Sequence, residues 1–224
     1  MIRGVDTYTH GHADSVLQSH RWRTVENSAG YLAPHLRPGL DLLDVGCGPG
    51  TLTVDLARRV APGHTLAIDV SEVPLAEARE HAQAQQVEVT FEVGDVYALA
   101  ADDASFDVVH AHQVLQHLTD PVAALREMAR VTRPGGLIAV RDVDYAATTW
   151  FPANPGLGRW LELYGRVARH NDAEPDAGRR LRSWARAAGL RNAAATTSAW
   201  CFATPAEREW WGTGMLHGEL LIRV

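Results

Sequence analysis

Apolar and polar residues alternate along most of the chain in blocks typical of alternating strands and helices. Short apolar runs predict strands at residues 40–45, 65–70, 87–93, 106–111 and 137–143. Amphipathic spacing between these runs predicts helices at residues 51–60, 71–86 and 120–131. Five strands separated mostly by helices favour a parallel, doubly wound α/β sheet.

Capping residues and prolines define where the helices begin and end. Ser71 precedes one helix as an N-cap, with Pro74 tolerated in the first turn. Asp120 followed by Pro121 opens another helix in the same way. The run Arg133-Pro134-Gly135-Gly136 is expected to end that helix before the fifth strand begins.

The two ends of the chain follow different patterns. An amphipathic helix is predicted at residues 14–36. After residue 145, a loop at 146–158 is followed by helices at 157–170 and 178–188 and by a β-compatible run at 192–203. Thr204-Pro205-Ala206-Glu207 forms a capping box for a short helix, and residues 217–224 are predicted to form a last strand. A length of 224 residues suits one α/β domain with additions at both ends.

The composition excludes several chemistries, because all 21 basic residues are arginine and there is no lysine. Walker-type phosphate loops, protein kinases and Schiff-base enzymes all need a lysine. The net charge of −6 disfavours non-specific nucleic-acid binding. Two cysteines in dissimilar settings and no long apolar run favour a cytoplasmic protein that does not enter a membrane.

The first strand runs into a turn with glycines at 46, 48 and 50, which exposes backbone N–H groups at a helix start. The dinucleotide fingerprint would need a glycine at position 51, which is Thr51. Asp44 stands two positions before the first glycine, so the pattern differs from that fingerprint. Asp69 and Asp95 follow the next two strands, and acids at this edge of a sheet can bind a ribose and an adenine amino group.

Several ordered motifs between about residues 30 and 145 resemble class I S-adenosylmethionine-dependent methyltransferases of the ubiquinone/menaquinone-biosynthesis type. These motifs are Asp44-Val45-Gly46-Cys47-Gly48-Pro49-Gly50, then Asp69, Gly94-Asp95-Val96, Phe106-Asp107-Val108-Val109, Val114-Leu115-Gln116-His117-Leu118, Leu125-Arg126-Glu127-Met128 and Arg133-Pro134-Gly135-Gly136.

The resemblance implies a Rossmann-like, mostly parallel sheet of seven strands whose C-terminal hairpin is antiparallel. Residues 192–203 and 217–224 would form that hairpin. The implied parts are an N-terminal helical lid at 1–36, a cofactor-binding core at 37–145, a substrate cap at 146–190 and C-terminal strands at 191–224.

The resemblance also implies the cofactor S-adenosylmethionine, released as S-adenosylhomocysteine, and a set of binding residues. Asp44 and the turn formed by Gly46, Cys47, Gly48, Pro49 and Gly50 would face its methionyl part. Asp69, beside Val70, would hold the ribose. Asp95 and the Val96 N–H, after Gly94, would bind the adenine, and the backbone near Ala111 and His112 would meet the methionine amino group.

A hydroxyl acceptor must lose a proton during methyl transfer, and histidine is the natural base for that step. His110, His112 and His117 cluster just after the fourth strand, beside the expected methyl position. His117 is the first candidate and His112 the second. The alternative is that these residues only pack or cap the strand end.

Aromatic residues at both ends of the chain are candidates for lining the acceptor site. Tyr8, His20 and Trp22 lie in the lid, and Tyr145 and Trp150 follow the fifth strand. Six of the seven tryptophans lie after residue 149, where they form either core packing or an aromatic wall for a bulky acceptor. The His10-x-His12 spacing is that of a metal ligand pair, but no partner ligand is fixed, so a lid is favoured and no metal is expected.

The sequence therefore predicts an enzyme that transfers methyl to O, C or N of a small, aromatic or apolar acceptor by in-line displacement. The alternatives are a non-catalytic S-adenosylmethionine- or nucleotide-binding protein and an RNA methyltransferase with a basic surface on residues 159–191. A nicotinamide-dependent oxidoreductase is disfavoured by the glycine spacing. The sequence is also compatible with a homodimer.

Overall fold

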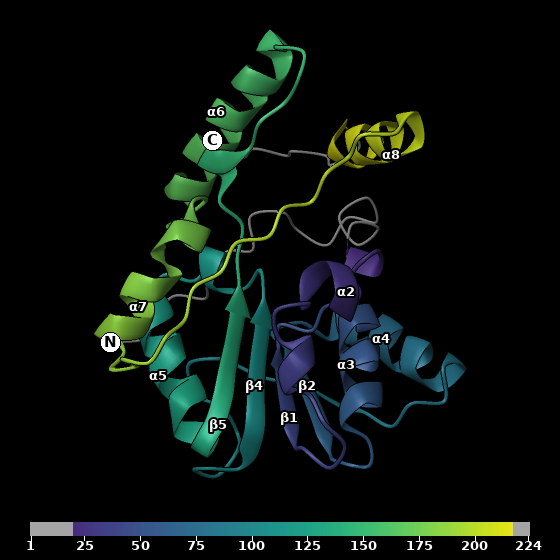
Figure 1. Ribbon diagram of the computed structural model, residues 1–224, viewed down its shortest axis with the longest axis vertical. Coiled ribbons are helices and arrows are strands. Elements are labelled where there is room, and N and C mark those ends of the chain that lie inside the picture. Colours follow the sequence, from purple (N-terminus) through teal and green to yellow (C-terminus); the bar gives the residue numbers. More distant parts are fainter. Residues whose placement is uncertain (1–19, 217–224) are drawn as a thin grey trace.

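The computed structural model describes residues 20–216, which form an α/β fold around one parallel sheet (Figure 1). Its five strands lie in the order β3-β2-β1-β4-β5, so the chain winds outward in both directions from β1. The strands are β1 (Leu42–Val45), β2 (Thr65–Asp69), β3 (Thr90–Val93), β4 (Phe106–His112) and β5 (Thr132–Arg141). The doubly wound sheet predicted from the sequence is confirmed.

Helices cover both faces of this sheet. The helices are α2 (Val25–Ser28), α3 (Thr51–Val60), α4 (Glu72–Ala84), α5 (Pro121–Val131), α6 (Pro155–His170), α7 (Leu181–Ala187) and α8 (Pro205–Leu216). Short 3-10 turns lie at Ala33–His35, Leu115–His117, Tyr145–Ala147 and Ala177–Arg180. Figure 1 shows α6 and α8 beyond the ends to which β4 and β5 point.

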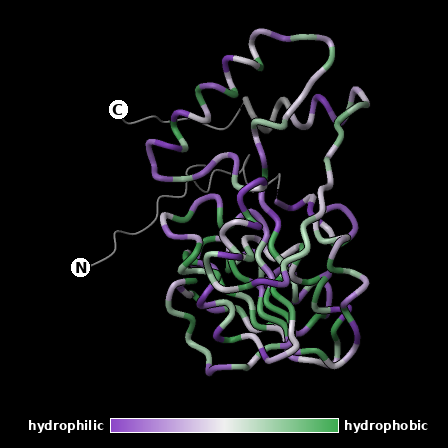
Figure 2. Tube along the Cα trace, turned by 60° about the vertical axis from the view of Figure 1, so that its left-hand side comes forward, coloured by the Kyte–Doolittle hydropathy of each residue, from purple (hydrophilic) through white to green (hydrophobic). Residues whose placement is uncertain are grey.

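Alternating residues of the strands divide the core between the two faces. Val45 and Val109 pack with α5, and Trp184 of α7 lies against the same cluster. Leu42 and Val108 point to the other face, toward α2 and α3. Figure 2 shows the strongest hydrophobic colouring along the strands at the centre of the body. Burial on both faces explains why the strands are continuous apolar runs.

The predicted helix caps are present. The Ser71 side chain accepts from the Val73 N–H, and the Asp120 side chain accepts from the Ala123 N–H. The Glu207 carboxylate accepts from the Thr204 N–H at 2.8 Å, which completes the capping box that begins α8. These local signals lie within four residues of the backbone they satisfy, so the sequence alone reveals them.

The seven-stranded sheet with an antiparallel hairpin is not found among the residues that the structure describes. Residues 192–203 form no strand there, and 217–224 lie outside the described part. Side-chain contacts hold the 192–203 segment instead: the Trp200 Nε1–H donates to the Asn27 carbonyl at 2.6 Å, and the Ser198 hydroxyl accepts from the Arg141 Nε–H. A strand needs a neighbour to pair with along its length, and the alanines that dominate this segment supply little side chain to pack on a sheet.

Two other predicted boundaries were wrong. The helix expected at 14–36 is, within its described part, broken into the short α2 and a 3-10 turn that includes Pro34. The strand expected at 137–143 begins earlier, at Thr132, and ends at Arg141. The register of the β4–β5 pairing shifts between Phe106 and Val108, so the Pro-Gly-Gly run forms an irregularity at the sheet edge.

Across residues 20–216, no helix is both long and apolar enough to cross a membrane.

Close packing at Gly50 sets how α3 and α4 approach each other below the glycine turn. Gly50 has φ +78°, and a Cβ atom there would lie 2.7 Å from the Ala78 Cβ. We expect Gly50→Ala to lower the free energy of unfolding by about 2–4 kcal/mol, from backbone strain plus overpacking. Gly135→Ala is the matched control, since Gly135 has φ +84° but open space around it. Urea unfolding of both variants checks this, and equal losses would contradict the packing explanation.

Candidate methyl-transfer site

The glycine turn between β1 and α3 has the backbone shape that its sequence requires. Gly46, Gly48 and Gly50 all have positive φ angles, of 69°, 54° and 78°. The N–H groups of Gly46 and Cys47 donate to the Ile68 carbonyl at 2.8 and 3.0 Å, which ties the turn to the end of β2. The turn, with Pro49, therefore lies at the carboxyl edge of the sheet, where open α/β folds bind ligands.

Asp44 lies buried beneath this turn, with 3% of its surface exposed. One carboxylate oxygen accepts from the Thr53 hydroxyl at 2.5 Å, and the other accepts from the His110 Nδ1–H at 2.7 Å. These contacts join β1 to α3 and to β4. Asp44 thus holds the elements around the turn, and both of its oxygens already have partners.

Asp69 ends β2 on the other side of the turn. Its Oδ2 accepts from the Gly48 N–H at 3.0 Å, and its Oδ1 accepts from the Ser71 N–H at 3.2 Å. Val70, the next residue, is 64% exposed. The Asp69 carboxylate is therefore fixed at the edge by two backbone donors.

The end of β3 contributes Gly94, Asp95 and Val96. The Asp95 Oδ1 accepts from the Tyr97 N–H at 2.9 Å, which shapes the turn. Val96 is buried in the core, and Gly94 packs closely against Ile68. The three acids that the sequence singled out thus stand at the ends of β1, β2 and β3 in order.

His112 ends β4 beside Ala111, which is fully buried. His112 is 5% exposed, and neither ring nitrogen has a hydrogen-bond partner within residues 20–216. Burial lowers the pKa of His112 well below its usual range, and the nearby Arg23, His110 and Arg141 lower it further. The ring is therefore neutral at pH 7 and carries a free lone pair.

His117 lies in the 3-10 turn after β4 and is also buried. The Gln116 side-chain amide lies 2.9 Å from the His117 Nε2 and donates to it. The Gln116 backbone N–H donates to Asp142, and burial raises the pKa of the Asp142 carboxyl to about 7. His117 thus has a partner that His112 lacks.

Buried polar atoms without partners concentrate at this edge. Within the described part of the chain they include atoms of Tyr31, His110, His112, Gln116 and Asp142. Folded proteins leave few such atoms, and a cluster of them marks a place where a ligand supplies the missing partners. Sequence reasoning missed Tyr31 and Asp142, because neither stands in a motif.

A chain of aromatic contacts connects the start of the chain to its end. The Trp22 ring lies 5.2 Å from Trp200 and 5.6 Å from Trp210. On α6, Trp160 lies 5.8 Å from Trp211, and Tyr145 lies 4.3 Å from the Tyr164 ring.

The remaining predicted acceptor-lining residues differ in how far they join these aromatic contacts. His20 lies next to the glycine turn, since its carbonyl accepts from the Thr51 hydroxyl at 3.0 Å. Trp150 makes no ring contact within the described residues, and Tyr8 lies outside them.

Residues 20–216 hold no group of three or more side chains that could bind a metal ion.

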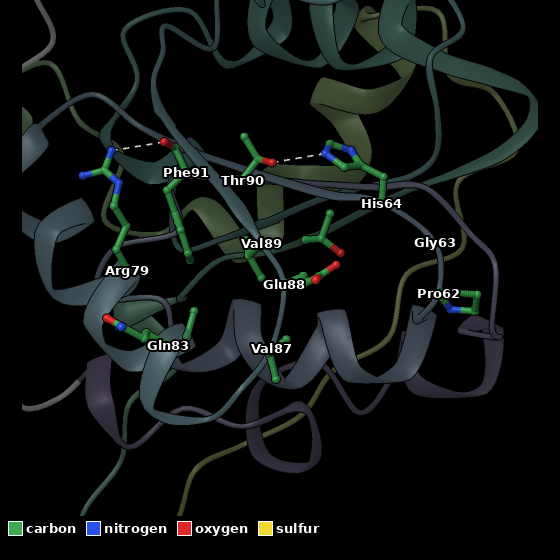
Figure 3. A pocket seen from close by; sticks show the side chains of 12 residues that line it. Pro62, Gly63, His64, Arg79, Gln83, Val87, Glu88, Val89, Thr90 and Phe91 are labelled. Atoms are coloured by element: carbon green, nitrogen blue, oxygen red, sulfur yellow. Dashed lines mark hydrogen bonds between the residues drawn. The ribbon is translucent and has the colours of Figure 1, made fainter.

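A pocket lies at the opposite edge of the sheet. A pocket of about 490 Å³ opens at the amino ends of β2 and β3, where the His64 ring faces the Thr90 hydroxyl at 3.2 Å (Figure 3). Arg79 at its rim donates to the Phe91 carbonyl. The acids and glycines of the opposite edge take no part in it.

Comparison with known proteins agrees with this geometry. A methyltransferase domain model matches residues 36–189. An uncharacterized methyltransferase of Schizosaccharomyces pombe is 35% identical over 92% of this chain and 75% of its own length. A ubiquinone biosynthesis O-methyltransferase of Azotobacter vinelandii is 34% identical over 71% of this chain and 68% of its own length.

Solved structures agree as well. A protein from Pyrococcus horikoshii has a TM-score of 0.52 and 26% identity over 64% of this chain and 68% of that one. The fold is also that of a Haemonchus contortus phosphoethanolamine N-methyltransferase, with a TM-score of 0.56 and 21% identity over 69% of this chain and 34% of that one. The chain belongs to the methyltransferase domain family. It is an S-adenosylmethionine-dependent methyltransferase of the small-molecule type.

His110 and His112 differ in what they stabilise, although both are buried on one face of β4. We expect His110→Phe to lower the free energy of unfolding by about 3 kcal/mol, because it leaves the buried Asp44 carboxylate short of a donor. His112→Phe removes no hydrogen bond and keeps the edge contact with Trp200, so its cost should stay below about 1 kcal/mol. Guanidinium unfolding of the two variants measures the difference, and a larger loss for His112→Phe would contradict the assignment.

Proposed function

We propose that this enzyme methylates a hydroxyl oxygen of a small, flat organic acceptor, with His112 accepting the hydroxyl proton. The observation that carries the proposal is a neutral, buried imidazole at the carboxyl edge of β4, neither of whose nitrogens has a partner among the described residues. The Azotobacter relative is named as an O-methyltransferase, which supports oxygen as the atom methylated.

The residues at the edge fit S-adenosylmethionine. The positive-φ turn has no side chains at its three glycines, so a ligand can approach its main chain closely, and carboxylates follow β2 and β3. In the proposed arrangement Asp69 accepts from the ribose hydroxyls, Asp95 and the Val96 N–H meet the adenine, and the Ala111–His112 backbone meets the methionine amino group. Asp44 acts through the turn, because Thr53 and His110 occupy its oxygens.

When bound, the cofactor supplies a methyl group on a positively charged sulfur. The protein's contribution is to hold the acceptor oxygen in line with that methyl group and to keep water out, which can contribute about 7–11 kcal/mol at best. His112 takes the proton as the oxygen gains its new bond to carbon. A general base of this kind contributes roughly 10²–10⁴-fold.

His112 suits this role better than His117, which the sequence placed first. The Nε2 of His117 already accepts from Gln116, so its lone pair is engaged. The cationic Arg23 and Arg141 that lower the pKa of His112 would also favour the oxyanion form of a nearby acceptor. A weak base is sufficient when the acceptor itself is made more acidic.

Residues 146–190 act as the substrate cap in this proposal. The aromatic rings of Trp160 in this cap and of Trp22, Tyr145 and Trp200 outside it offer flat surfaces for an aromatic or apolar acceptor.

The basic side chains of residues 146–190 suit RNA less well. Arg169, Arg179 and Arg180 pair with Asp176, Asp144 and Glu174, so they do not present a free cationic face.

Removing the Asp69 carboxylate should weaken cofactor binding. We expect Asp69→Ala to raise the dissociation constant of S-adenosylhomocysteine by about 5- to 150-fold, the loss of hydrogen bonds to a charged group worth about 1–3 kcal/mol. Calorimetry measures it, and Asp102→Ala, an exposed acid in a loop away from the edge, is the control. Unchanged affinity in Asp69→Ala would show that the ribose binds elsewhere.

Kinetic measurements distinguish the two candidate bases, His112 and His117. We expect His112→Phe to lower kcat by roughly 10²–10⁴-fold with unchanged affinity for S-adenosylhomocysteine. His117→Phe should retain most of the activity. The assay follows methyl transfer to a panel of phenols and catechols, and full activity in His112→Phe would remove it as the base.

A further inference from the structure

Arg141 is the last residue of β5, and no ion pair holds its guanidinium among the described residues, although Asp142 lies near enough to raise its pKa. Its Nε–H donates to the Ser198 hydroxyl at 3.2 Å, and no carboxylate lies within ion-pair distance of it in residues 20–216. Burial lowers the pKa of Arg141, which reflects the cost of the charge in this setting. A guanidinium has five N–H donors, so most of its donors stay unused.

Trp200 fixes the orientation of this guanidinium. The Arg141 Cζ lies 4.4 Å from the centre of the Trp200 ring, and the Trp200 Nε1–H is anchored on the Asn27 carbonyl. Stacking on an aromatic ring leaves the in-plane N–H groups of arginine directed outward, where they match the two oxygens of a carboxylate. The stack therefore preorganises a two-donor contact.

The neighbours of Arg141 add hydrogen-bond donors. His112 is its partner in the register of β4 and β5, and its ring touches Trp200 at 5.8 Å edge to face. The Tyr31 hydroxyl is buried with no hydrogen-bond partner in residues 20–216, near enough for Arg141 to affect its pKa. Asp142, the next residue along the chain, is also near Arg141, but one of its oxygens accepts from the Gln116 N–H. Buried donors without acceptors are costly unless a ligand satisfies them.

We propose that Arg141 binds a carboxylate of the acceptor, held against Trp200 and assisted by the Tyr31 hydroxyl. The acceptor class is then a hydroxylated carboxylic acid, with its hydroxyl directed to His112 and its carboxylate to Arg141. The proposal rests on the proposed function, because it assigns the acceptor end of the same site. Arg141 is a specificity-determining residue in this arrangement, and the proton still goes to His112.

The test measures binding of matched acceptor pairs to the full chain saturated with S-adenosylhomocysteine. The probes are 4-hydroxybenzoate, 3,4-dihydroxybenzoate and 3,4-dihydroxycinnamate, each beside its methyl ester, followed by quenching of tryptophan fluorescence and by calorimetry. We expect at least one acid to bind ten times or more tighter than its ester. Arg141→Gln should abolish this preference, and Tyr31→Phe should reduce it.

Arg186→Gln, on the exposed side of α7, is the control and should keep the preference. Equal binding of every acid and ester, no binding of any acid, or a preference that survives in Arg141→Gln each overturns the proposal. Unchanged S-adenosylhomocysteine affinity shows that the variants are folded. An acid that binds through Arg141 but is never methylated on oxygen contradicts the proposed function alone.

Discussion

The buried Asp44 carboxylate is the interaction on which the arrangement of the site depends. It accepts from Thr53 of α3 and from His110 of β4, so a single side chain on β1 connects the three elements that surround the glycine turn. A buried carboxylate tolerates little movement of its donors, because each lost hydrogen bond exposes a charge to a medium that solvates it poorly. The turn is thereby held at a fixed height above the sheet.

The carboxyl edge of the sheet is divided into two chemically different halves. The half over β1, β2 and β3 carries the glycine turn and carboxylates, which suit the hydroxyl and amino groups of a nucleoside. The half over β4 and β5 carries His112, Arg141 and the aromatic rings that pack around Trp200. One half suits a cofactor and the other an acceptor, and β1 and β4 bring the two together.

The absence of lysine is compatible with the chemistry of the proposed site. The proposed cofactor contacts use carboxylates and main-chain groups, and Arg23 and Arg141 are the arginines whose charges lower the pKa of His112. A guanidinium stacks on a ring and stays charged when partly buried, whereas an ammonium loses its proton more readily. Arginine is therefore well suited to the place beside Trp200.

The sequence by itself determined the order of strands and helices, the helix caps and the glycine turn with its acids, because each depends on neighbours a few residues away. It did not determine the path of residues 192–203, the break between α2 and the 3-10 turn, or the meeting of Tyr31, His112, Arg141 and Trp200. Those four residues come from separate parts of the chain, and only tertiary packing brings them to one edge. Whether a histidine there has a partner or a free lone pair is a property of that packing, so only the structure distinguished His112 from His117.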